Sequence, residues 1–444
     1  MKKILLFIVI CINLNLKCEV TKSAIVIKGN SGYHTGDTIK LYGVKTGADA
    51  KYKRYLIYSK YDNQYTKYIS ERKLQLLEDS LNFWEELWFK QRAAKIKKQG
   101  WNKNIRDKVT DDANYKYNLF SINFDEYQDV FINEYIKELY HSIFPRYIAT
   151  SSQKSDKVLI IDSELSFITS FNEGFLVLST GFLSNTGSEE ELVKAIAIQV
   201  AHNVLDHNFI NKRSKIRQQN AAIAFALVAI VGYVAIKASQ DDSDGVEYND
   251  DDYEESYDDN VSIYHERKTN TTDFTKTECN YEQRCQAIGV ANDFNAYYAT
   301  DSKFRSKNEY LFIIKECITR EAWYAFKNRE YERALQLEEK LFNADIADEE
   351  DYLLKVKILK QKYKTNDDLY NILDLIAEAK LLQIKPLIEF NEEEAMVYSI
   401  LGDKIKCSEA YRRYKDGLLL VKENGDNVND EIIRIDSIIN NLNE

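Results

Sequence analysis

The sequence lacks several patterns that would point directly to a function. Its six cysteines include no C-x-x-C pair, which removes the zinc-ribbon signature. It has no D-x-[DN]-x-[DN]-G pattern, the signature of an EF-hand calcium loop. Proline is scarce, with only Pro145 and Pro386 among 444 residues. The composition is nevertheless that of a folded protein, 44% hydrophobic and 12% aromatic. The length suffices for roughly two to four domains.

A basic domain is also missing, because the charge is concentrated in one acidic segment. The formal net charge is −11, and residues 241–260 alone carry eleven acidic and no basic residues. The rest of the chain is therefore close to neutral, and we expect no nucleic acid as a partner. We expect the acidic insertion at 239–262 to be a solvated, disordered loop. A calcium site is the alternative for this segment.

The N-terminus has no apolar run long enough to remain across a bilayer. Lys2 and Lys3 precede nine apolar residues at 4–12, the pattern of a signal peptide over residues 1–18. A lipid anchor at Cys18 and a buried N-terminal strand are the alternatives. The signal predicts an exported protein, in the bacterial periplasm or cell envelope.

The first folded region is predicted to be a small β module at residues 19–70. Short runs of β-branched and aromatic residues alternate there with turn residues, which favours a structural or adhesive role. Segment 71–98 changes to helical spacing and is predicted to pack on its own domain, with a partner as the alternative. The apolar face of that helix is formed by Leu74, Leu77, Leu81, Trp84 and Trp88.

The central region is predicted to combine strands at 158–162 and 174–183 with a helix at 189–207. Ser188, followed by Glu191 three residues later, is a capping-box pattern that predicts where this helix begins. An uncharged run, Ala221 to Ile236, comes next. As a helix it would span about 24 Å, less than the roughly 30 Å of a hydrocarbon core. We expect a buried or membrane-touching hairpin helix there, with a membrane span as the alternative.

The C-terminal region, residues 301–444, is predicted to be helical. Small residues and aromatics recur in it at positions where paired helices approach one another, as in helix-turn-helix solenoids. The pattern resembles a degenerate tetratricopeptide array, and a plain helical bundle is the alternative.

The motif helix, EEELVKAIAIQVAHNVLDH, has the spacing of a zinc-protease helix. Where H-E-x-x-H would stand, it reads Ile198-Gln199-x-x-His202. It is preceded, in order, by VLIID, FITSFNEG, FLVLSTGFL and SEEEL. With these blocks in this order, residues 120–300 resemble the HtpX/BepA-like zinc metallopeptidases, gluzincins of the family that includes the CAAX prenyl endopeptidase. Tetratricopeptide tails also occur in the BepA-like branch.

The resemblance implies where the chemistry of that family would stand. It puts the zinc-ligand positions at Ile198, His202 and Arg284, and the general base at Gln199. Members of the family often have a histidine at the position of His207. Isoleucine and arginine offer no lone pair to a metal, and a glutamine amide is not a usable base. We therefore expect no bound metal and no catalysis, with zinc as the cofactor if the family activity is retained.

A rebuilt metal site has few candidate ligands in this helix. His202 and Asp206 lie four residues apart on one helix face and could share an ion. His207 would lie about 140° around the helix from His202 and is not expected to reach that ion.

These observations predict a mostly helical α+β protein. It would comprise the small β module, a gluzincin-type peptidase domain at 71–300 with a short sheet and the motif helix, and the helical repeat-like tail. The resemblance implies a peptide-binding edge strand formed by Gly174, Phe175, Leu176, Val177, Leu178 and Ser179.

The expected function is that of a metalloendopeptidase-family protein that has lost zinc and catalysis. It would bind an extended peptide or a protein partner as a scaffold in envelope proteostasis, with membrane contact through Ala221 to Ile236. The alternatives are an active zinc metalloendopeptidase with a non-standard site and a membrane-associated structural protein.

Overall fold

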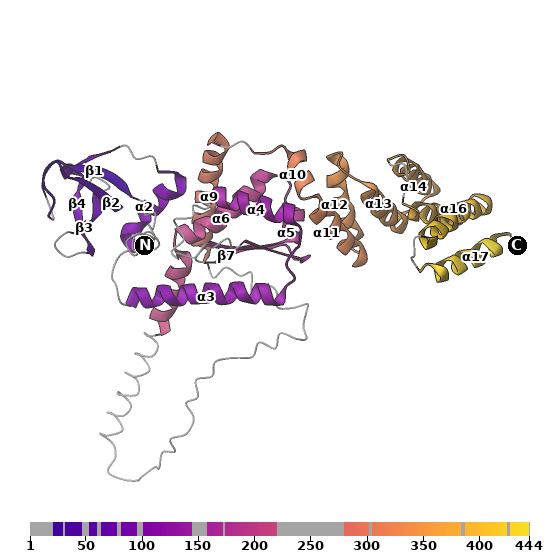
Figure 1. The fold of residues 1–444 in the computed structure, drawn as a ribbon, viewed down its shortest axis with the longest axis horizontal. Coiled ribbons are helices and arrows are strands. Elements are labelled where there is room, and N and C mark those ends of the chain that lie inside the picture. Colours follow the sequence, from indigo (N-terminus) through magenta and orange to yellow (C-terminus); the bar gives the residue numbers. More distant parts are fainter. Residues whose placement is uncertain are drawn as a thin grey trace, which may run out of the picture.

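The computed structural model describes most of the chain outside its N-terminus and one long internal segment. The described residues are 21–29, 32–46, 53–59, 64–77, 81–95, 101–143, 158–171, 174–219, 279–301, 304–382, 387–423 and 427–443. The signal-type segment, the run from Ala221 to Ile236 and the acidic insertion lie outside these residues. Figure 1 shows a β module, a central domain and a helical tail following one another along the longest axis.

The N-terminal module is a five-stranded antiparallel sheet with strand order β4-β3-β2-β1-β5. Its strands are β1 (Lys22–Val26), β2 (Thr38–Thr46), β3 (Lys53–Ser59), β4 (Gln64–Ser70) and β5 (Leu74–Leu76), with a 3-10 turn at Glu71–Lys73. Helix α2 (Phe83–Lys95) places Phe89, 1% exposed, in the core of this sheet. The sheet therefore extends past the expected boundary at residue 70, because β5 pairs with β1.

The central domain is a three-layer arrangement around a short sheet with strand order β6-β8-β7. Its elements are α3 (Trp101–Asn123), α4 (Val130–Ile143), β6 (Val158–Ile161), β7 (Ile168–Phe171), β8 (Phe175–Ser179), α5 (Thr180–Asn185), α6 (Glu189–Val204), a helix at 207–219 and α9 (Tyr281–Asp301). Alternate side chains of β6 and β8 contact different helices: Phe175 and Val177 join α3, whereas Leu176 and Leu178 join α4 and α6. Both faces of the sheet are thus covered (Figure 1).

The expected edge strand is in fact the central strand of this sheet, so that prediction is wrong. β8 pairs in parallel with β6 on one side and antiparallel with β7 on the other. All five of its residues are buried. Within the stretch from Gly174 to Ser179, the main chain of Leu176 to Leu178 is therefore already paired on both sides, and β8 cannot accept an added peptide strand there. The cause is the crossover that places β7 beyond β8 and not between β6 and β8.

Main-chain groups of the two outer strands, β6 and β7, also form hydrogen bonds along part of their length. On β6, the amide of Tyr127 donates to the carbonyl of Ile160 at 2.9 Å, and the amide of Asp162 donates to the carbonyl of Asp125 at 2.9 Å. On β7, the Ser170 amide is bonded to α6, as described below.

The C-terminal tail consists of helices that pack on their successors. They are α10 (Lys307–Ile313), α11 (Lys315–Lys327), α12 (Tyr331–Asn343), α13 (Glu349–Lys362), α14 (Asn366–Ala379), α15 (Glu389–Leu401), α16 (Lys404–Glu423) and α17 (Asn429–Asn443). α13 also contacts both α11 and α15, so alternate helices form one inner layer. The start of α13 follows the start of α11 by 34 residues, the period of tetratricopeptide repeats. The expected α+β, mostly helical class with a small N-terminal sheet and a helical tail is confirmed.

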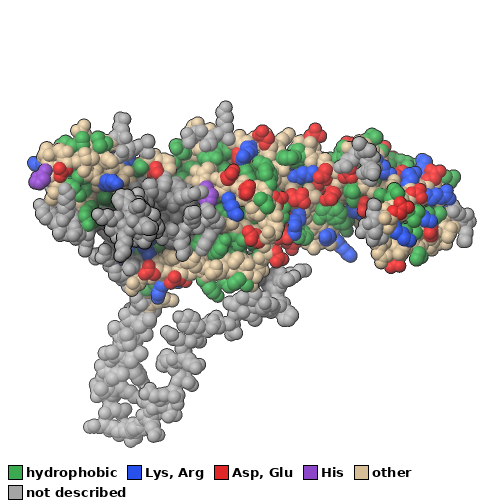
Figure 2. Space-filling view, in the orientation of Figure 1, with side chains coloured by type: hydrophobic (Ala, Val, Ile, Leu, Met, Phe, Trp, Pro, Cys, Tyr) green, Lys and Arg blue, Asp and Glu red, His purple; other side chains and the backbone are tan. Residues whose placement is uncertain are grey.

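Ion pairs link neighbouring helices of the tail. Glu393 of α15 is 2% exposed and receives Lys357 and Lys360 of α13. Lys315 of α11 reaches Asp351 of α13 at 3.2 Å. On the face drawn in Figure 2, acidic and basic side chains are interspersed along this region.

One hydrophobic core continues from the central domain into the tail. The same cluster contains Leu178 of the sheet, Ile196 of α6 and Leu354 of α13. Polar contacts cross the same joint: Thr180 donates to Glu321 at 3.1 Å, and Lys340 donates to the carbonyl of Ser184 at 2.6 Å. The expected boundary between residues 300 and 301 is therefore not a break in the core.

Within the part of the chain that the structure describes, no helix is both long enough and apolar enough to cross a membrane.

Candidate metal centre

Helix α6 begins as its sequence predicts. Ser188 is the N-cap, and its side chain accepts a hydrogen bond from the amide of Glu191. The Glu191 carboxylate reaches back to the Gly187 amide at 2.7 Å, one residue before the cap. The buried residues of α6 include Leu192, Ile196 and Val200, which attach the helix to the core.

Gln199, which the resemblance puts at a general-base position, forms structural hydrogen bonds. The Oε1 atom of Gln199 accepts the amide hydrogen of Ser170 on β7 at 3.2 Å. The Ser170 hydroxyl donates to the Gln199 carbonyl at 3.1 Å and itself accepts from the side-chain amide of Asn203 at 3.1 Å. Gln199 is 8% exposed and ties α6 to the sheet. The preceding residue, Ile198, packs against the hydrophobic core.

The motif helix ends earlier than its sequence suggests, and this changes the site. Leu205 is the C-cap of α6, and Asp206 has a φ of 65°, in the left-handed region. Arg106 of α3 holds this turn, with Nη1 and Nη2 at 3.2 and 2.7 Å from the two carboxylate oxygens of Asp206. The guanidinium also lies over the ring of Phe209, 4.0 Å from its centroid. The helix at 207–219 then starts in a new direction.

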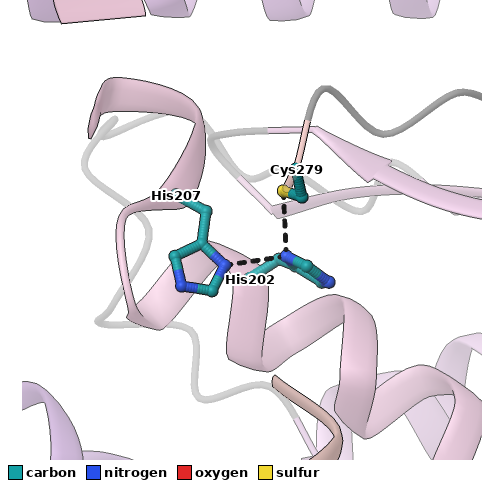
Figure 3. A group of neighbouring side chains, drawn as sticks. All are labelled: His202, His207 and Cys279. Atoms are coloured by element: carbon teal, nitrogen blue, oxygen red, sulfur yellow. Dashed lines mark hydrogen bonds between the residues drawn. The ribbon is translucent and has the colours of Figure 1, made fainter. Parts of the chain in front are cut away.

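The turn brings His207 back to His202, and Cys279 joins them from another part of the chain. The Nδ1 atoms of the two histidines are 2.9 Å apart, and Cys279 Sγ lies 3.2 Å from His202 Nδ1. Figure 3 shows both residues converging on His202 from the turn after α6 and from the segment before α9. The three residues are 6%, 1% and 7% exposed, in the order 202, 207 and 279. The three ligand atoms lie within 4.8 Å of one another, so this group could hold a metal ion.

Side chains of α9 and of the helix at 207–219 surround this cluster. Gln286 Oε1 lies 3.3 Å from His207 Nε2, and Asn211 directs its side-chain amide to Cys279 Sγ at 4.0 Å. The side-chain amide of Gln283 donates to Asn211 Oδ1 at 3.0 Å, and the backbone amide of Gln283 donates to Asn280 Oδ1 at 2.9 Å. Cys279 thus stands next to the N-terminus of α9, where the helix dipole favours a negatively charged sulfur.

The electrostatics of the cluster keep His202 uncharged. Burial lowers the pKa of His202 to about 4, and electrostatic interactions with His207 and Arg284 add to the effect. At neutral pH its imidazole therefore keeps a nitrogen lone pair, the form that binds metal ions.

Two expectations about the motif helix are corrected by this geometry. His207 does reach His202, because the helix does not continue to residue 207 and the 140° rotation does not apply. Asp206 does not share a site with His202, because its carboxylate pairs with Arg106.

Two residues of α9 lie beside this cluster, Arg284, which the resemblance puts at the third ligand position, and Gln286. Arg284 is near enough to affect the pKa of His202, and Gln286 contacts His207. Cys279 was missed as a candidate because no C-x-x-C or H-x-x-x-H spacing marks it.

Comparison with protein-family models gave no match for this chain, and neither did comparison with curated proteins.

Proposed function

We propose that the protein is a non-hydrolytic binding scaffold, related to the HtpX/BepA-like peptidases, whose central domain has turned its catalytic positions to structural use. The observation that carries this proposal is the hydrogen bond between Gln199 Oε1 and the Ser170 amide. A general base must face a water molecule, whereas this side chain faces a strand edge. Ile198, packed against the core, and Arg284 at the third ligand position support the same conclusion, because neither offers a lone pair to zinc.

The proposed partner is an extended peptide or a protein, held by the helical tail. Strand addition to the central sheet is not part of this proposal, since β8 is paired on both sides. Stacked helix pairs with alternate helices in one inner layer form the extended surfaces that solenoid proteins use for binding. Together with the signal-type N-terminus, this supports a role in the proteostasis of a bacterial envelope, with membrane contact by residues 221–236 as a further part of the proposal.

Hydrolysis by the purified full-length protein tests the first half of the proposal. Casein is incubated with the unaltered protein and with Gln199→Glu, each with and without a chelator. We expect no cleavage from either protein, because Ile198 and Arg284 still deny the family zinc its ligands. Chelator-sensitive cleavage by the unaltered protein would favour the active peptidase and overturn the scaffold.

The place on the protein where a partner binds tests the second half of the proposal. In cells that produce the protein, a lysine-reactive cross-linker followed by mass spectrometry should join a partner to lysines of residues 315–415. Partner cross-links confined to lysines of residues 22–73 would instead assign binding to the β module.

A second candidate function is metal binding, which the cluster of His202, His207 and Cys279 favours. We propose zinc as the ion. Imidazole nitrogen and thiolate sulfur are the ligands that zinc prefers in proteins, whereas magnesium and calcium take oxygen ligands. This site would be distinct from the family site, with which it shares His202 alone.

A further inference from the structure

The arrangement around His202 Nδ1 is difficult to satisfy with protons alone. Two polar atoms approach this one nitrogen, His207 Nδ1 at 2.9 Å and Cys279 Sγ at 3.2 Å. An imidazole nitrogen carries either one proton or one lone pair in the ring plane, so it forms one good hydrogen bond at a time. A cation between the three atoms would use the lone pairs of all of them at once.

The outer contacts of the cluster prepare His207 for such a cation. Gln286 Oε1 accepts a hydrogen bond, so at 3.3 Å it places the ring proton of His207 on Nε2. The lone pair of His207 is then on Nδ1, the atom that faces His202. Metal-binding histidines commonly donate their second ring N–H to such an oxygen. The Asn211 amide beside Cys279 Sγ supports the thiolate in the same way.

The distances are close to those of a zinc site. Zinc bonds of about 2.0 Å to nitrogen and 2.3 Å to sulfur, at tetrahedral angles, separate neighbouring ligand atoms by roughly 3.3 to 3.6 Å. The observed separations of 2.9 and 3.2 Å reach that range by small side-chain rotations. His207 follows a turn that Arg106 of α3 holds in place, and Cys279 precedes Asn280, whose side chain accepts the amide hydrogen of Gln283 in the first turn of α9.

We infer that His202, His207 and Cys279 bind one zinc ion as a structural clasp between the α6 turn and the start of α9. Cys279 follows His207 by 72 residues in the chain, so the ion would fasten together two segments that are distant in sequence. A zinc site that hydrolyses peptides needs a carboxylate base. Among the described residues, the possible metal ligands gathered at this point are His202, His207 and Cys279, and none of them is a carboxylate. The inference rests on the metal-binding candidate function proposed above.

Arg284 sets the affinity of the clasp. Its positive charge lies close enough to act on His202, so it would also repel a cation bound there. The thiolate offsets one of the two charges of zinc, which makes Cys279 the ligand that the site can least do without. Replacing Arg284 with glutamine should therefore strengthen zinc binding, whereas Gln286→Leu should weaken it by roughly tenfold or more.

Metal content and a cobalt spectrum of the full-length protein test the inference. The protein is stripped with a chelator and dialysed against zinc alone, and bound zinc is measured by mass spectrometry. We expect one zinc per chain, loss of it in Cys279→Ser and His207→Gln, and its retention in Cys285→Ser. Cys285 lies on α9 and is exposed, so it is the matched control.

Cobalt in place of zinc should give the charge-transfer band of a thiolate ligand, and this band should be missing from Cys279→Ser. The unaltered protein decides the question even if a variant fails to fold. Substoichiometric zinc, a cobalt spectrum without the thiolate band, or full zinc content in folded Cys279→Ser would overturn the clasp. Copper that stays bound through the chelator treatment and keeps zinc out of the site would overturn the assignment of the ion.

These results are separable from the proposed scaffold function. Bound zinc with chelator-sensitive casein cleavage would overturn the scaffold and leave the site. A protein with neither zinc nor cleavage would overturn the clasp and leave the scaffold.

Discussion

The stability of the tail should depend on pH through the buried carboxyl group of Glu338 on α12. The side chain is 0% exposed, and neither of its oxygens has a hydrogen-bond partner among the described residues. Burial raises the pKa of Glu338 to about 9, with the negative charge of Asp351 adding to the effect and Lys355 opposing it. Glu338 is therefore protonated at neutral pH in the folded protein.

The sign and size of the effect follow from proton linkage. Between its usual pKa of 4.5 and about 9, Glu338 holds a proton in the folded protein that the unfolded chain releases. Its contribution is therefore fully present below pH 4.5 and is lost as the pH rises toward 9. Each pH unit in this window costs about 1.4 kcal/mol, so the loss between pH 5.5 and pH 8.5 is on the order of 4 kcal/mol. That is a large share of the roughly 5 to 15 kcal/mol that stabilises a typical domain.

The perturbation is Glu338→Gln, which keeps the shape and removes the titration. Urea unfolding followed by circular dichroism, at pH 5.5 and 8.5, gives the free energy of unfolding of the variant relative to the unaltered protein. We expect the variant to gain several kcal/mol at pH 8.5 relative to pH 5.5. Glu321, whose pKa burial raises to about 7, is present in both proteins and cancels in the difference.

Glu339→Gln is the matched control, because Glu339 is the exposed neighbour on the same helix. Its stability should follow that of the unaltered protein at both pH values. A difference between Glu338→Gln and the unaltered protein that stays constant from pH 5.5 to 8.5 would refute the reasoning.

The remaining predictions concern the central domain and its turn. Gly181→Ala should cost about 1 to 3 kcal/mol in urea unfolding, because its Cβ would lie 2.5 Å from the carbonyl oxygen of Glu164; an unchanged midpoint would contradict this. Gly289→Ala, with nothing within 4 Å of its Cβ, should instead stabilise helix α9 by up to about 1 kcal/mol, and a loss would contradict the open surroundings. Gln199→Leu should lose about 1 to 3 kcal/mol, because it leaves a β7 amide buried without its acceptor; equal stability in thermal unfolding would show that the hydrogen bond is dispensable. Arg106→Met should lower zinc affinity in a chelator competition without touching a ligand, since it releases the turn after α6; unchanged affinity would mean that the turn holds without it.

The sequence predicted the kind of fold well because its local signals agree with the final packing. Ser188 caps α6 as its pattern indicates, and β6 and β8 lie within the segments expected as strands, although helix α5 replaces the second of these from Thr180 onward. The segment at 71–98 shows the limit of such signals. Leu74 has helical spacing to the residues that follow, yet it lies in β5, because pairing with β1 decides its conformation.

The candidate site could be predicted only in part, since its geometry depends on a break in the helix. Helical periodicity places His207 away from His202 as long as the helix continues. The left-handed Asp206 ends it, and the clamp that stabilises this turn comes from Arg106, 100 residues earlier in the chain. The strand order β6-β8-β7 is equally invisible in local patterns, because it arises from pairing between segments. Long-range contacts of this kind leave no periodic signal in a single sequence.

The uninterrupted core between the sheet and helices α11 to α13 limits how the sequence of this protein can evolve. The last helices, α16 and α17, pack on α15 in a hydrophobic cluster that is separate from the core at the joint, so they can be added, lost or exchanged with little effect on that joint. The first repeats cannot be swapped for those of another protein unless the α5 surface changes with them, because Thr180 and Ser184 are matched to Glu321 and Lys340. Variation in length should therefore accumulate at the C-terminal end, while the joint is inherited as one piece.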